Sequence, residues 1–189
     1  VDLSKMNDEN HTISMVESTG NTGKSNYAEA TLNLSEEISS SKNVTVEFTV
    51  KMTGSINAYT RFGIKVSDNG NGEGFYVIMN SSSTGARFQV GNLQSRHWDG
   101  LFSKDWDTRH DSYTDAVAAL VAGEGLQCRV IRTGGTMTLS MYIEGEWVLM
   151  ATYTCNANAA TDIGFCVGGN GGNTWTFSDI TVADNSAQA

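Results

Sequence analysis

Apolar and polar residues alternate strictly along several stretches of this 189-residue chain, and this pattern limits the possible fold more than any other feature. In segment 43–53 the even positions from Val44 to Met52 are apolar, whereas the odd positions from Thr45 to Thr53 are polar. Successive side chains of a strand point to opposite faces of its sheet, so the pattern predicts a strand with one buried and one wet face. Such strands are typical of antiparallel sheets. The same alternation recurs in segments 27–34, 59–67 and 136–143.

Turn signals rich in Gly and Asn divide the chain into about eleven predicted strands, with clear turns at 68–72, 134–135, 144–145 and 168–172. Many short antiparallel strands at this spacing predict an all-β fold, an antiparallel two-sheet β-sandwich. Segment 92–125 lacks alternation. Within it, a capping Ser112, helical spacing of apolar residues and Gly123 as a stop predict one short helix at 112–122. The predicted strands are 12–16, 27–34, 43–53, 59–67, 74–80, 86–90, 126–132, 136–143, 147–154, 162–167 and 175–182.

Charge and apolar content exclude several kinds of partner. The net charge of −9 repels polyanions, so no nucleic acid is expected. No stretch approaches ~18 consecutive apolar residues, so no membrane insertion is expected. The length fits one module, predicted to cover 1–183, with 184–189 as a tail or the start of a linker. Because the first residue is Val1, the chain is interpreted as a fragment or mature product of a longer protein.

The three cysteines, Cys128, Cys155 and Cys166, allow at most one disulfide. Their spacing matches no zinc motif. Cysteine is among the most buried residue types, so buried free thiols in strands are favoured over a disulfide.

The last third of the chain carries a recognisable series of motifs. A basic strand, Gly turn and second strand (LQCRVIRTGGTMTLSMY, 126–142) precede a Gly-x-Trp turn (EGEW, 144–147), a Gly-rich strand (DIGFCVGG, 162–169) and a terminal strand (WTFSDITV, 175–182). This series resembles the concanavalin A-like, or laminin-G-like, jelly-roll modules that accompany bacterial carbohydrate-active enzymes. The resemblance implies a jelly roll that binds carbohydrate. It also implies a structural calcium near the terminal strand, with Asp179 as a ligand.

Segment 94–113 is the most informative candidate for a binding site, because it holds two of the four Trp and two of the three His. An indole offers an apolar face for a sugar ring, and neighbouring Arg, His and Asp can bind hydroxyls. The alternative is that Trp98 and Trp106 only anchor the loop to the sandwich. The candidate ligand-binding residues of this segment are Arg96, His97, Trp98, Trp106, Arg109, His110 and Tyr113.

The wet faces of the strands offer a second candidate platform. Tyr59, Arg61 and Arg87 alternate with apolar neighbours and are expected on the solvent side, where Tyr142 and Tyr76 are also placed. The alternative is ordinary cross-strand pairing on a solvated face. Trp147 and Trp175, in contrast, are interpreted as residues of the core or of a sheet edge.

Catalysis has little support in the sequence. Retaining glycosidases need two carboxylates about 5–5.5 Å apart, whereas Glu47 is the only acid in its strand and Glu144 and Glu146 lie in a predicted turn. The Asp68–Glu73 stretch lacks the full calcium-loop spacing and is interpreted as a hairpin turn.

The sequence therefore predicts a non-catalytic carbohydrate-binding module, secreted or at the cell surface, covalently linked to other modules of a larger extracellular bacterial protein. Two alternatives stay open: an adhesin or protein-interaction module, and a glycoside hydrolase or lyase with an unfamiliar site.

Overall fold

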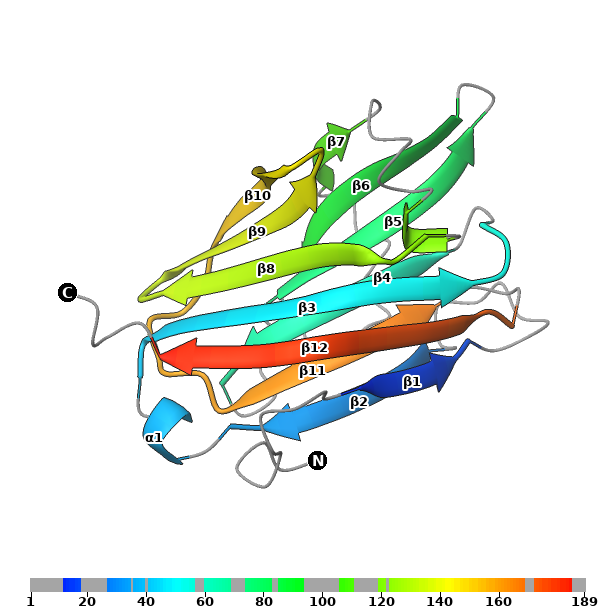
Figure 1. Ribbon diagram of the computed structural model, residues 1–189. Coiled ribbons are helices and arrows are strands. Elements are labelled where there is room, and N and C mark those ends of the chain that lie inside the picture. The colour runs from blue at the N-terminus through cyan, green and yellow to red at the C-terminus, as the bar shows by residue number, and fades with distance from the viewer. Residues whose placement is uncertain are drawn as a thin grey trace.

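Two six-stranded antiparallel sheets pack face to face in the computed structural model of the chain (Figure 1). The structure describes residues 12–17, 27–34, 36–39, 41–56, 60–68, 74–82, 85–93, 106–110, 119–121, 123–168 and 172–184. The first sheet has the order β1-β12-β3-β8-β9-β10, and the second has the order β2-β11-β4-β5-β6-β7. The predicted all-β fold, an antiparallel two-sheet sandwich, is therefore confirmed.

The strands of the first sheet are β1 (Ile13–Val16), β12 (Thr174–Asp184), β3 (Asn43–Thr53), β8 (Leu126–Thr133), β9 (Thr136–Ile143) and β10 (Glu146–Thr154). The strands of the second sheet are β2 (Tyr27–Asn33), β11 (Asp162–Gly168), β4 (Arg61–Ser67), β5 (Gly74–Ser82), β6 (Gly85–Leu93) and β7 (Trp106–His110). One four-residue helix, α1 (Glu36–Ser39), precedes β3.

All eleven predicted strands are present, most within one or two residues of the expected ends. Two elements differ from the expectation. The strand β7 lies inside the segment expected to be loop, and the helix α1 was not predicted. The predicted helix at 112–122 lies mostly outside the described residues, although 119–121 are helical and the Gly123 amide donates to the Ala119 carbonyl (3.2 Å). Most of the predicted hairpin turn at 68–73 lies outside the described residues; the strands β4 and β5 on either side of it pair antiparallel.

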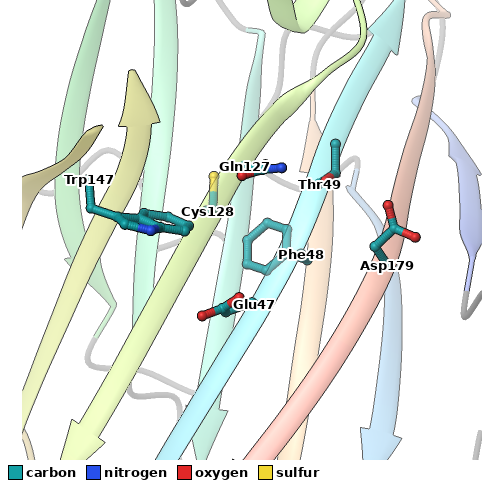
Figure 2. Close-up of a pocket in the computed structure, with 7 residues that line it drawn as sticks. All are labelled: Glu47, Phe48, Thr49, Gln127, Cys128, Trp147 and Asp179. Atoms are coloured by element: carbon teal, nitrogen blue, oxygen red, sulfur yellow. The ribbon is translucent and has the colours of Figure 1, made fainter. Parts of the chain in front are cut away.

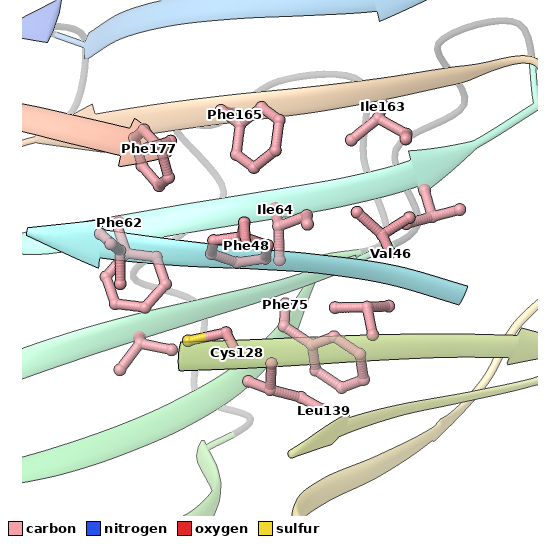
Figure 3. Packing of buried hydrophobic residues seen from close by; sticks show 14 of the residues in the cluster. Val46, Phe48, Phe62, Ile64, Phe75, Cys128, Leu139, Ile163, Phe165 and Phe177 are labelled. Atoms are coloured by element: carbon pink, nitrogen blue, oxygen red, sulfur yellow. The ribbon is translucent and has the colours of Figure 1, made fainter. Parts of the chain in front are cut away.

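The core lies between the sheets and is centred on an aromatic cluster (Figure 3). Phe48 and Phe177 come from the first sheet, whereas Phe62 and Phe165 come from the second. The ring centroids of Phe165 and Phe177 are 4.8 Å apart, and those of Phe48 and Phe165 meet edge to face at 5.3 Å. Trp175 is completely buried beside Phe62, as expected for a core residue. These contacts across the interface hold the two sheets together.

Two buried polar groups add hydrogen-bond connections to those made by the apolar core. Glu17, after β1, accepts hydrogen bonds from Asn173 and from Trp175 Nε1 (3.0 Å) at the start of β12. At the other end of the sandwich, Arg132 of β8 is 1% exposed and donates to the Val66 carbonyl of β4 (2.5 Å). The two networks join β1 to β12 and the first sheet to the second.

All three cysteines are free thiols, as favoured from the sequence. Cys128 and Cys166 are buried, and Cys155 is half-buried. Burial raises the pKa of the Cys128 thiol, so this group stays protonated and unreactive in the folded protein.

Candidate functional site

The outer face of the first sheet carries the candidate site, where side chains of β3, β8, β9, β10 and β12 point away from the core. The face is mainly hydroxyl-bearing, because the outward positions of β3 and β9 are rich in Thr and Ser. One aromatic cluster interrupts it. Tyr142 of β9 is 42% exposed, and Trp147 of β10 is half-buried beside it. Leu149, the next outward position of β10, is also exposed.

The cluster is built by a two-residue hairpin. Glu144 and Gly145 connect β9 to β10 with φ angles of 53° and 86°, and two successive positive φ values define the type I′ turn favoured in hairpins. The turn fixes the register, so Tyr142 and Trp147 are directly paired across the strands. Their rings meet at 5.3 Å between centroids and an interplanar angle of 63°. This edge-to-face contact holds the indole in place on the sheet.

A cation and an anion extend the cluster toward β3. The Arg129 guanidinium lies over the Trp147 ring, 3.9 Å from its centroid. Arg129 Nε also donates to Glu47 Oε1 at 2.7 Å. Glu47 and Arg129 are a cross-strand pair of β3 and β8. The guanidinium is therefore held by an indole and a carboxylate together, which locks Trp147, Arg129 and Glu47 into one unit.

A shallow hollow of about 110 Å³ lies beside this unit (Figure 2). Trp147 forms one wall and Asp179 of β12 lies at the opposite side, as Figure 2 shows. Polar side chains from β3 and β8 lie between them. We call this feature the Trp147 hollow; its lining residues are Glu47, Phe48, Thr49, Gln127, Cys128, Trp147 and Asp179. An aromatic wall facing hydrogen-bonding groups suits a ligand that is apolar on one side and polar on the other.

Asp179 reaches the hollow because β12 is irregular at that point. The pairing of β12 with β3 shifts register between Ser178 and Thr181, which marks a β-bulge. Asp179 itself has a φ of 51° and is exposed. The left-handed region is unfavourable for side chains other than Gly, although Asp and Asn tolerate it best. The bulge thus places a carboxylate at the edge of the hollow at a cost in backbone energy.

Asp179 was also the predicted calcium ligand. Calcium takes six to eight oxygen ligands, and among the described residues no group of three or more His, Cys, Asp or Glu could hold a metal ion. Glu47, the second carboxylate at the hollow, already accepts a hydrogen bond from Arg129. Asp179 as a calcium ligand therefore stays a prediction from the resemblance alone.

Half of the binding residues predicted from the sequence lie outside the described residues: Tyr59, Arg96, His97, Trp98 and Tyr113. The others lie in strands of the second sheet. Arg87 belongs to β6, and Trp106, Arg109 and His110 belong to the edge strand β7. One row of paired residues crosses four strands from Arg61 through Ile78 and Gln89 to Arg109. The fold thus collects these predicted residues on one sheet, on the opposite side of the core from the Trp147 hollow.

The prediction that Arg61 lies on a solvent face is wrong. Arg61 is 2% exposed, and every residue of β4 is buried on both faces of the strand. Tyr76, the neighbour of Gly63 in the pairing of β4 with β5, is 1% exposed, so its expected solvent position is wrong as well. Alternation identifies the core face of a strand, but a polar opposite face need not be wet when other parts of the chain cover it.

The sequence prediction placed Tyr142 on a solvent face, and the structure confirms it. The same analysis assigned Trp147 to the core or to a sheet edge. Trp147 does lie in an edge strand, β10 of the first sheet, but its indole is on the outer face of the sheet and not in the core. The signal that could have found this site is the Glu144-Gly145 turn. A two-residue turn pairs 143 with 146 and 142 with 147, which places Trp147 beside an outward Tyr142.

Within the part of the chain that the structure describes, no helix is long and apolar enough to cross a membrane.

Comparisons with known proteins support the fold. No protein-family model and no curated protein matches the sequence. Solved structures do match. A functionally unknown protein from Saccharomyces cerevisiae is similar with a TM-score of 0.56 and 13% identity, over 95% of this chain and 90% of that one. A legume lectin-like domain from Entamoeba histolytica has a TM-score of 0.54 and 10% identity, over 93% and 89%.

The carbohydrate recognition domain of Emp46p, in a potassium-bound form, is similar to a comparable degree. Its TM-score is 0.53 and its identity 11%, over 93% of this chain and 88% of that one. At these identities the likeness concerns the fold, and it confirms the concanavalin A-like jelly roll predicted from the resemblance.

Proposed function

We propose that this chain is a non-catalytic saccharide-recognition module and that the Trp147 hollow contacts the sugar. The observation that carries the proposal is that Tyr142 and Arg129 both contact the Trp147 ring and hold it in place on the outer face of the first sheet. A sugar ring has C–H groups on one side and hydroxyls around its rim. The indole wall suits the first, and Gln127, Thr49 and the carboxylates at the hollow suit the second.

The fold supports the same function at a coarser level. Two of the similar structures are named as a lectin-like domain and a carbohydrate recognition domain. Those functions belong to those proteins, but the likeness favours a saccharide over other ligands for this chain. Trp98, which lies outside the described residues, and Trp106 of β7 belong to the proposal as a second surface. The proposal also includes covalent attachment to other modules of a longer protein and a secreted or cell-surface location. The similar structures from Saccharomyces cerevisiae and Entamoeba histolytica come from eukaryotes, so they lend no support to a bacterial setting.

Glycan-array binding followed by calorimetry tests the proposal. The unaltered chain should bind at least one saccharide class. Trp147→Ala should weaken that binding at least roughly ten-fold, or ~1.4 kcal/mol, because an aromatic anchor is removed. Leu149→Ala is the matched control, since it removes an exposed apolar side chain from the same strand outside the hollow.

Three outcomes would contradict parts of the proposal. Equal binding by the Trp147→Ala and unaltered chains, with loss in Trp98→Ala or Trp106→Ala, would move the site to segment 94–113. No binding to any glycan, with capture of a protein partner, would favour the adhesin alternative. Release of reducing ends from a polysaccharide panel would favour the hydrolase or lyase alternative.

A further inference from the structure

The charges at the Trp147 hollow are unbalanced. Of its seven lining residues, all within the described part of the chain, two carry carboxylates and none carries a cation. The nearby cation, Arg129, is engaged by Glu47 at 2.7 Å and by the Trp147 ring at 3.9 Å. Arg129 neutralises Glu47, which leaves the carboxylate of Asp179 as the uncompensated charge of the hollow.

The backbone at Asp179 is a second, independent observation. Asp179 is one of two residues other than Gly, among those described, with a positive φ; the other is Glu144 in the β9–β10 turn. A turn of that type requires positive φ, whereas a strand such as β12 does not. Backbone outliers inside regular elements cluster at binding sites, where the surrounding structure maintains them. Here the outlier sets the position of the carboxylate of the hollow that Arg129 does not engage.

We propose that the Trp147 hollow selects a saccharide that carries no negative charge, and that Asp179 is the residue that sets this preference. The inference rests on the proposed function. A uronate or sulfate in the hollow would face the Asp179 carboxylate without a cation to compensate, whereas neutral hydroxyls can donate hydrogen bonds to it. The chain's net charge of −9 acts in the same direction at longer range.

The test uses charge-matched probes: cellotetraose, mannotetraose and maltotetraose, each with its C6-oxidised uronate. The unaltered chain should bind a neutral member at least about five-fold more tightly than its uronate at low salt, as expected for two unit charges about 4 Å apart in water. The ratio should shrink at high salt because the repulsion is screened. Asp179→Asn keeps a residue that tolerates the left-handed backbone and should bring the ratio close to one.

Glu144→Gln is the matched control, because it removes another exposed carboxylate at positive φ that does not line the hollow. Its ratio should equal that of the unaltered chain. Asp179→Gly gives a readout of a different kind. Gly relieves the backbone strain, so this variant should keep or raise the melting temperature while it loses the preference for the neutral probe.

The outcomes separate the two proposals. Uronate binding as tight as neutral binding, or an unchanged ratio in Asp179→Asn, would overturn the selection by charge while saccharide recognition stands. A ratio that falls equally in Glu144→Gln would assign the effect to net charge rather than to Asp179. If neither these six probes nor a glycan array gives any binding, the proposed function fails and this inference fails with it.

Discussion

Replacing Arg132 with Met should destabilise the fold more than any surface substitution on the same strand. The Arg132 guanidinium donates to the Val66 carbonyl at 2.5 Å, to Asn156 Oδ1 at 2.9 Å and to the Asn158 carbonyl at 2.9 Å. Val66 belongs to the second sheet, whereas Asn156 and Asn158 follow β10. One buried side chain thus joins β8 to three other places in the sequence.

The expected magnitude follows from two opposing terms. Hydrogen bonds to charged groups contribute about 1.5–3 kcal/mol each, so the three short bonds together contribute roughly 4.5–9 kcal/mol. Methionine avoids the cost of burying a charge, which is several kcal/mol. The net loss should therefore be about 2–4 kcal/mol. In a domain of this size that corresponds to a melting temperature lower by roughly 4–16 °C.

Urea unfolding measured by tryptophan fluorescence checks the value, with Arg129→Met as the matched control. Arg129 lies on the same strand, but its side chain is 29% exposed and its salt-bridge partner Glu47 is 40% exposed. Because exposed ion pairs contribute little, this control should lose less than about 1 kcal/mol. The reasoning is refuted if Arg132→Met loses no more than the control at an unchanged m-value.

Two further predictions concern positions away from the candidate site. Gly54→Ala should destabilise the protein far more than Gly145→Ala. Both glycines have positive φ, but an added Cβ at Gly54 would lie 1.8 Å from Asn173 Oδ1, whereas an added Cβ at Gly145 would have no atom within 4 Å. Similar melting temperatures for the two variants would contradict this prediction. Iodoacetamide should label Cys155 of the native protein well before either buried cysteine, since burial raises the pKa of the Cys128 thiol. Mass spectrometry of chymotryptic peptides gives the order, because cleavage after Tyr153 and Phe165 separates Cys155 from Cys166. Early labelling of Cys128 would show that the core opens.

Local patterns gave the strands but not their partners. The alternation in 43–53 and 136–143 defines β3 and β9 to the residue, because periodicity is a property of contiguous sequence. In contrast, β3 pairs with β8 and β12, which lie far along the chain. No local signal specifies such pairing, which depends on how the two sheets pack as a whole.

The candidate site was predicted only in part, because some of its residues depend on local alternation and others on the pairing between strands. Tyr142 was placed correctly because its own strand alternates. Trp147 needed the register across the hairpin, and Asp179 needed the bulge in β12, which alternation does not reveal. The prediction for Arg61 failed because alternation does not reveal that both faces of β4 are buried.

The strand order also has a consequence for how the protein is made. The strand β12 lies between β1 and β3, and β11 lies between β2 and β4 (Figure 1). Until residues 162–184 have left the ribosome, β1 and β2 have no neighbour in either sheet, and β3 and β4 each present an open edge. Open edges of this kind invite pairing with other chains. Chaperone capture of nascent chains stalled before residue 162 should therefore be strong, and it should end once the last two strands emerge.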